Sequence, residues 1–177
     1  MWELICHHTY KYKGFPVDLT NYNNDGDYPV AADFAPDGAA PGSGALNFTR
    51  PEHHVAIARR PCWQTLVGLR VECVLRLNQH YPGKPQVVIA GADSFAFEIR
   101  QAGLYASFVG PSTVPGASRD GLDTYQHLLP GSPAYVVPVG RWLRCGFAHD
   151  GLDTMELYAD GRVLARRRAC RASAQRE

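Results

Sequence analysis

Hydrophobic and polar residues alternate along several stretches of the chain, as they do in a β-strand that buries one face. Over residues 68–78 the apolar face is made by Leu69, Val71, Cys73, Leu75 and Leu77. Arg70, Glu72 and Arg76 fall on the opposite face. The same period of two returns over residues 95–99, 104–108, 143–147 and 155–159. None of these stretches has the spacing of an amphipathic helix, so the pattern predicts an all-β fold.

Asp-Gly pairs separate many of the predicted strands. They occur at Asp25-Gly26, Asp37-Gly38, Asp120-Gly121, Asp150-Gly151 and Asp160-Gly161. Both residue types tolerate the positive φ that tight turns between twisted strands need. The last two pairs predict a meander of strands over residues 141–148, 154–159 and 162–167, and Gln101-Ala102-Gly103 predicts a further hairpin connection. We expect roughly ten to twelve short strands and therefore two antiparallel sheets packed face to face.

Composition narrows the class of protein. The chain has 177 residues, 45% hydrophobic and 20% charged, which fits one globular domain and argues against intrinsic disorder. Its 18 Lys and Arg residues against 17 Asp and Glu give a net charge of +1, so we expect no nucleic-acid partner. No apolar run approaches the ~18 residues of a membrane-spanning helix. No signal peptide opens the chain, and the compartment is left open.

The cysteines argue against a dense disulfide framework. The five are Cys6, Cys62, Cys73, Cys145 and Cys170. They form no Cys-x-x-Cys pair, and an odd number leaves at least one thiol unpaired. Because Cys73 and Cys145 fall within apolar alternation, we interpret both as small buried hydrophobic residues.

Three segments in order resemble the laminin-G-like domains of the concanavalin A-like lectin/glucanase superfamily. The first is Gly42–Phe48 followed by Val55–Ile57, and the second is the long strand from Leu66 to Leu77. The third is the family's "W … DG … LYxDG" stretch, carried here by Trp142, Asp150-Gly151 and Leu157-Tyr158-Ala159-Asp160-Gly161. The resemblance implies a jelly-roll sandwich of two curved sheets over residues 1–165, with Trp142 capping the core. It also implies a lectin-like module that binds glycans, proteins or surfaces, in a family that is mostly extracellular.

The C-terminus departs from the family, whose members usually continue past this hairpin with further strands. Residues 166–177 are basic and polar and lack the alternation for two more strands. We therefore expect a sandwich without its C-terminal strands, followed by a polar tail. The resulting sheet edge, which we place at Trp2–Tyr10, would pair with a partner chain or with the remainder of a longer polypeptide.

The sequence favours a non-catalytic module over an enzyme. Glycosidases need two carboxyl groups, one to protonate the leaving oxygen and one to attack or to activate water. The nearest candidates are Asp153, Glu156 and Asp160, but the Glu-x-Asp-x-x-Glu pattern of the superfamily's glycosidases is absent. No serine lies in a Gly-x-Ser-x-Gly elbow. A glycoside-active enzyme and a structural subunit of a larger assembly stay as alternatives.

Two segments contain candidate metal ligands. Asn23, Asp25 and Asp27 offer the hard oxygens that Ca²⁺ prefers, and the resemblance adds weight because calcium is frequent among laminin-G-like domains. A plain turn is the alternative. The pairs His7-His8 and His53-His54, with Cys6, are weaker zinc candidates, because adjacent residues in a strand point to opposite faces.

Aromatic residues gather near the N-terminus and offer a possible glycan platform. They are Tyr10, Tyr12, Phe15, Tyr22 and Tyr28, with Asn23 among them. Sugar rings stack on aromatic faces and accept hydrogen bonds from amide groups, so Tyr10, Tyr12, Tyr22, Tyr28 and Asn23 are the predicted ligand-binding residues. The alternative is that these side chains pack in the core or pair across strands.

Overall fold

The computed structural model describes residues 6–10, 16–30, 32–50, 52–58, 68–81, 83–91, 94–108, 120–124 and 134–168. These residues form β-strands and no helix, and each ladder between the strands is antiparallel. The predicted all-β class with antiparallel sheets is confirmed. The chain divides into two compact units, Met1–Leu66 and Val67–Glu177. The single domain predicted over residues 1–165 is therefore described below as two units.

The second unit contains a four-stranded sheet that includes the predicted meander. Its strands are β7 (Leu69–Arg76), β12 (Trp142–His149), β13 (Thr154–Ala159) and β14 (Arg162–Arg168), in the order β14-β13-β12-β7. We refer to it as the β12 sheet. The three strands predicted after residue 140 are present within one residue of their expected ends. Strand β14 continues to Arg168, so Arg166–Arg168 belong to this sheet and not to the predicted polar tail.

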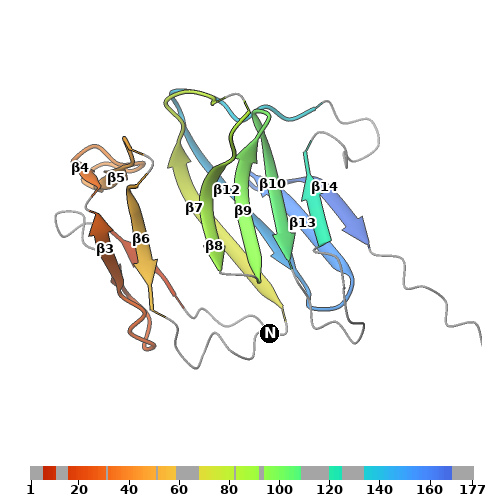
Figure 1. The fold of residues 1–177 in the computed structure, drawn as a ribbon, viewed down its shortest axis with the longest axis horizontal. Helices are drawn as coiled ribbons and strands as arrows, with labels where there is room; N and C mark the ends of the chain where they lie inside the picture. Colours follow the sequence, from red (N-terminus) through yellow and green to blue (C-terminus); the bar gives the residue numbers. More distant parts are fainter. Residues whose placement is uncertain are drawn as a thin grey trace, which may run out of the picture. The chain divides into compact units, whose positions relative to one another are not determined.

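The same unit contains a second four-stranded sheet, which we call the β9 sheet. Its strands are β8 (Gln86–Gly91), β9 (Phe95–Arg100), β10 (Gly103–Phe108) and β11 (Asp120–Asp123), in the order β11-β10-β9-β8. In Figure 1, β8, β9 and β10 are drawn in green in front of β12 and β13 in blue. The two sheets therefore form the layers expected from the alternating pattern.

Aromatic side chains fill the space between the two sheets. Phe97 of β9 and Phe147 of β12 are fully buried, and their ring centroids are 5.8 Å apart. Phe95 packs against the same Phe147 ring at 6.2 Å. At one side of the sandwich, the Arg167 side chain of β14 donates a hydrogen bond to the Gly121 carbonyl of β11 at 2.9 Å. The core lies where the sequence pattern places it.

Two hairpins in this unit have turns of two residues with positive φ. Asp160 and Gly161 connect β13 to β14 with φ values of 46° and 78°. Gln101 and Ala102 connect β9 to β10 with φ values of 48° and 63°. Both turns fall where the sequence predicts a connection, although Gly103 is the first residue of β10 and lies outside the turn.

The first unit is built from three short two-stranded ladders. Strand β1 (His8–Thr9) pairs with β2 (Val17–Asp18), β3 (Gly26–Val30) with β6 (His54–Ile57), and β4 (Asp33–Ala35) with β5 (Ala45–Asn47). Within the predicted edge Trp2–Tyr10, His8 and Thr9 are thus hydrogen-bonded to β2. Residues 1–5 lie outside the described part of the chain, and pairing of this segment with a partner stays a prediction.

Trp142 does not occupy its expected place. Its neighbour Leu143 is fully buried between the sheets, so Trp142 points to the other face of the β12 sheet. There the Arg76 guanidinium of β7 lies 5.2 Å from the centre of the indole ring. The prediction that Trp142 caps the core is wrong, because the residue stands one position from the inward-facing set of its strand.

Candidate functional site

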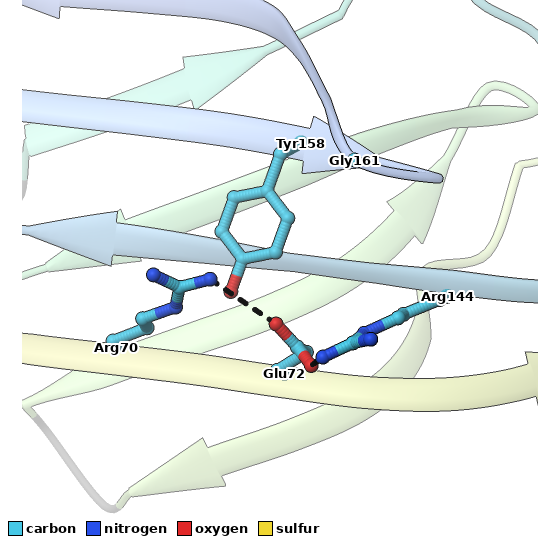
Figure 2. Close-up of a pocket in the computed structure, with 5 residues that line it drawn as sticks. All are labelled: Arg70, Glu72, Arg144, Tyr158 and Gly161. Atoms are coloured by element: carbon cyan, nitrogen blue, oxygen red, sulfur yellow. Dashed lines mark hydrogen bonds and ion pairs between the residues drawn. The ribbon is translucent and has the colours of Figure 1, made fainter.

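The outer face of the β12 sheet, opposite Leu143 and Phe147, carries a shallow hollow. Its volume is about 270 Å³, and it is lined by Arg70, Glu72, Arg144, Tyr158 and Gly161. Arg70 and Glu72 come from β7, Arg144 from β12 and Tyr158 from β13. Figure 2 shows the Tyr158 side chain reaching from its own strand across β12 toward the two residues of β7. We refer to this site as the outer-face hollow.

Tyr158 is held in place by a glycine on the neighbouring strand. Gly146 of β12 lies directly opposite Tyr158 in the ladder, and a Cβ added there would stand 2.6 Å from the phenol oxygen. The bare backbone at Gly146 lets the ring cross β12. The Tyr158 hydroxyl then donates a hydrogen bond to the Val71 carbonyl of β7 at 2.8 Å. The ring is therefore fixed across three strands.

Charged groups continue from the tyrosine across the hollow. The Arg70 guanidinium lies 5.1 Å from the Tyr158 ring centre, and its NH2 group is 3.2 Å from Glu72 Oε2. Glu72 Oε1 accepts a second, charge-assisted hydrogen bond from Arg144 Nε at 2.6 Å. With two arginines and one glutamate among its lining residues, the hollow has a formal charge of +1.

The protonation states of these groups follow from their contacts. Burial alone would raise the pKa of Glu72, but hydrogen bonds from Arg144 and Arg70 outweigh it and hold that pKa below its usual value. The hydrogen bond to Tyr158 raises the pKa of Arg70. Burial raises the pKa of Tyr158, so the phenol keeps its proton at neutral pH. The hollow therefore presents an ionised carboxylate, two guanidinium groups and a neutral phenol.

The three carboxylates weighed as the nearest catalytic candidates are not among the residues that line the hollow, and each pairs with an arginine from outside it. Glu156 accepts from Arg166 Nε at 2.6 Å, and Asp153 lies 3.5 Å from Arg168. Asp160 is in the β13–β14 turn and pairs with Arg141 at 3.3 Å. These contacts agree with the interpretation of the three as outer-face charges, while catalysis itself is not tested by them.

Sequence reasoning did not single out the lining of the hollow. Alternation does place Arg70 and Glu72 on the polar face of their strand. However, Glu72 and Arg144 are 72 positions apart in the sequence, and their pairing depends on β12 lying beside β7. One sequence signal could have pointed to the hollow. Gly146 and Tyr158 belong to neighbouring strands of the predicted meander, and a glycine opposite an aromatic residue leaves room for the ring to lie across the glycine. This signal needs the strand register to be recognised.

The predicted glycan platform belongs to the first unit. Tyr22 is 38% exposed and Asn23 is exposed with a φ of 51°, while Tyr10 is half-buried. Tyr12 lies outside the described residues. Tyr28 falls in β3, but its side chain is not among those described. The platform stays a prediction.

Asp18 of β2 lies beside the predicted metal loop and organises the backbone there. Its carboxylate accepts hydrogen bonds from the His7, Thr20 and Asn24 amides at 2.8–3.0 Å and from the Thr20 hydroxyl at 2.7 Å. Burial alone would raise the pKa of Asp18, but these bonds lower it from an ordinary 3.8 to about 2. Asp25 Oδ1 in turn accepts from the Asp18 amide at 2.7 Å. One oxygen of a predicted calcium ligand is thus committed to the protein backbone.

Within the described ranges, no three His, Cys, Asp or Glu side chains are grouped closely enough to hold a metal ion. A calcium ion at Asn23, Asp25 and Asp27 would therefore need the Asn23 amide and backbone carbonyls as further ligands. Of the zinc candidates, His8 Nε2 lies 2.6 Å from the Asn24 carbonyl, and His54 Nδ1 lies 2.8 Å from the Glu52 carbonyl. These rings contact the backbone of nearby loops.

A comparison with solved structures finds a similar fold in a toxin. The crystal structure of the binding domain of Paraclostridial Mosquitocidal Protein 1 matches with a TM-score of 0.70 at 8% sequence identity. The match covers 93% of this chain and 40% of that one, so the chain spans well under half of the domain it resembles. At this identity the likeness shows the fold alone. No family model matches the chain, and no curated protein matches it.

Together, the sheets, the hollow and the likeness define an all-β protein of antiparallel sheets with a charged, aromatic hollow on one outer sheet face. No helix in the described part of the chain is long and apolar enough to cross a bilayer.

Proposed function

We propose that the chain is a non-catalytic binding module that recognises an acidic glycan at the outer-face hollow. The observation that carries this proposal is the fixed Tyr158 ring beside Arg70, Glu72 and Arg144. A ring held by a hydrogen bond and by close contact with the backbone loses little freedom when a ligand binds. The hollow is thus preorganised before it meets a ligand.

The charges of the hollow favour a ligand with one negative group. Arg70 and Arg144 share a single glutamate, which leaves an excess of one positive charge. The Arg144 side chain is 66% exposed, so part of its guanidinium faces solvent. Exposed ion pairs contribute only about 0–1 kcal/mol, and a carboxylate or sulfate on a sugar can compete for these N–H groups. Glu72 would accept hydrogen bonds from sugar hydroxyls on the same ligand.

The protonation of Glu72 supports binding over glycoside hydrolysis. A general acid at neutral pH needs a carboxyl group with a raised pKa, and the pKa of Glu72 is lowered. Tyr158 and the two arginines do not supply the second carboxyl group that hydrolysis requires. The likeness to a toxin's binding domain, which shows the fold alone, is in keeping with a binding role.

The proposal is tested by an array of immobilised neutral, carboxylated and sulfated saccharides. Wild-type protein is expected to bind acidic saccharides in preference to neutral ones. Arg144→Gln is expected to weaken binding by up to about fivefold, because it removes a guanidinium that faces solvent and a contact at such an exposed site contributes up to about 1 kcal/mol. Arg166→Gln is the matched control, since Arg166 also pairs with one glutamate on the same sheet and lies outside the hollow.

Three results would count against the proposal. Equal loss in Arg144→Gln and Arg166→Gln would indicate a general charge effect. Binding of proteins but of no saccharide would favour an interaction module or a structural subunit. Release of reducing sugar from a bound saccharide would establish the alternative of a glycoside-active enzyme.

The kinship with laminin-G-like domains is likewise a proposal, carried by the resemblance alone.

A further inference from the structure

Two cysteines meet on neighbouring strands of the β12 sheet. Cys73 of β7 and Cys145 of β12 are direct partners in the antiparallel register. Their sulfur atoms are 3.8 Å apart, and both thiols are free. Both residues point into the sandwich, where Cys145 is fully buried and Cys73 is half-buried. The sequence placed each of them in an apolar strand face but gave no reason to pair them.

The backbone geometry suits a covalent bond between the two sulfurs. Residues directly opposite each other in an antiparallel pair have Cα atoms about 4.5–5.5 Å apart. A disulfide spans Cα separations of about 4.4–6.8 Å. The Cys73–Cys145 pair therefore needs only side-chain rotation to bring the sulfurs from 3.8 Å to a bonding distance of about 2.05 Å.

We propose that Cys73 and Cys145 are an oxidative modification site, where a peroxide converts the two thiols into a cross-strand disulfide. The proposal stands on register, sulfur separation and burial, and it is independent of the binding function proposed above. It gives a chemical role to two residues that the sequence predicts only as small buried hydrophobic ones.

The reaction balances with hydrogen peroxide as the oxidant. The thiolate of Cys73, the less buried of the two, attacks one peroxide oxygen and breaks the O–O bond. Hydroxide leaves, takes up a proton to become water, and Cys73 becomes a sulfenic acid. The Cys145 sulfur then attacks the Cys73 sulfur, the S–O bond breaks, and the second water leaves with the Cys145 proton. Two thiols are oxidised by two electrons, and one peroxide is reduced to two waters.

The order of the two steps follows from the environment of each thiol. The hydrogen bond with Cys73, followed by burial, raises the pKa of Cys145, so this thiol is a poor first nucleophile. Cys73 is half-buried on an edge strand and Cys145 is fully buried, so a small oxidant should reach Cys73 first. The buried thiol therefore acts as the resolving group, already in contact with the sulfur that it attacks.

The bond would tie together parts of the sandwich that are distant in sequence. The two cysteines are 72 positions apart, and the segment between them includes all four strands of the β9 sheet. Closing a loop of this length restricts the unfolded chain, so the oxidised protein should unfold at a higher temperature than the reduced protein. The covalent link also holds the edge strand β7 to β12.

The test treats the dilute, fully reduced chain with hydrogen peroxide at neutral pH, then alkylates the remaining thiols and maps the peptides by mass spectrometry. We expect a peptide pair joined through Cys73 and Cys145, with the loss of two hydrogens. Cys73→Ser and Cys145→Ala should each abolish the cross-link, and Cys6→Ser should leave it intact. Folded protein should form this link about tenfold or more faster than protein in urea, because the register holds the sulfurs together.

Each other outcome contradicts the proposal. Cys73 recovered as a sulfinic acid beside an alkylated Cys145 would show that the buried thiol does not resolve the intermediate. Equal rates with and without urea would show that the native register does not direct the pairing. If Cys145→Ala fails to fold, the Cys73→Ser variant alone tests the proposal. In that variant the proposal predicts that the cross-link is lost and that Cys145 is recovered in its alkylated form, and a cross-link that persists would contradict it. A melting temperature that is unchanged by oxidation would contradict the predicted constraint.

Discussion

Tyr158 lies across Gly146, and the contact leaves no room for a side chain on the glycine. A Cβ at Gly146 would stand 2.6 Å from the Tyr158 phenol oxygen and 2.0 Å from the Val71 carbonyl. Real Cβ atoms do not approach other atoms so closely, and a carbonyl in a strand cannot rotate away. The position of the tyrosine in the hollow therefore depends on a glycine one strand away.

Gly146→Ala should destabilise the second unit by about 1–3 kcal/mol, the usual range for overpacking in a sheet or core. Either β7 separates from β12 or the Tyr158 ring leaves its place, and the hydrogen bond to Val71 is lost in both cases. Urea unfolding at 25 °C measures the change. Tyr158→Phe serves as the control, because it removes the hydrogen bond and keeps the ring. Equal stability of Gly146→Ala and wild type would contradict the described packing.

The turn between β9 and β10 offers a stabilising substitution. Gln101 and Ala102 both have positive φ, a conformation that costs a residue with a Cβ about 1–2 kcal/mol. Ala102→Gly removes this strain, but glycine also increases the conformational entropy of the unfolded chain, which offsets part of the gain. The net effect should be a rise of about 0.5–1 kcal/mol in the free energy of unfolding. Ala106→Gly in the same hairpin is the control and should destabilise, since Ala106 is buried within β10. A loss of stability in Ala102→Gly, measured by urea unfolding, would show that the turn lacks this strain.

Asp18 should make the stability of the first unit depend on acid. Its pKa falls from 3.8 to about 2 in the folded state, so its contribution is complete above pH 4 and is lost as the pH falls through 2. A shift of this size corresponds to about 2 kcal/mol. Asp18→Asn should lose most of this at neutral pH and flatten the pH dependence between 4 and 2. Thermal melts over that range measure both effects, and parallel curves for wild type and variant would contradict them.

Calcium binding by the loop of Asn23, Asp25 and Asp27 stays a prediction. An ion that binds only the folded state raises the melting temperature as its concentration rises. Melts in calcium and in chelator should then separate, and Asp25→Ala should close the gap. The gap is the quantity to compare, because Asp25→Ala also removes the hydrogen bond to the Asp18 amide and lowers both curves. Coincident wild-type melts would leave the loop as a plain turn.

The sequence predicts the second unit well where a residue type and its conformation agree. Asp160 and Gly161 are the residue types that a two-residue hairpin turn needs, and they form one. Gln101 and Ala102 adopt the same positive φ without that preference, so the sequence shows a connection but not its geometry. The flanking strands impose the turn here, because their pairing is supported by buried residues such as Phe97.

The hollow could be predicted only in part, because it depends on long-range register. Alternation predicts that Arg70 and Glu72 share the outer face, yet it cannot tell which strand lies beside β7. That neighbour, β12, supplies Arg144 to the hollow and Cys145 to the core. Trp142 is a different case, because the local alternation already indicates its direction: a residue next to the inward-facing Leu143 points outward regardless of its hydrophobicity.

Ligand binding at the outer-face hollow can be followed residue by residue in a nuclear magnetic resonance titration. An oligosaccharide of uronic acid is added to ¹⁵N-labelled protein while backbone amide and arginine Nε–H signals are followed. The signals expected to move belong to Arg70, Glu72, Arg144 and Tyr158, and Arg144→Gln should reduce the movement at the same ligand concentration. Signals that move instead at Tyr22 and Asn23, or none that move at millimolar ligand, would contradict binding at the hollow.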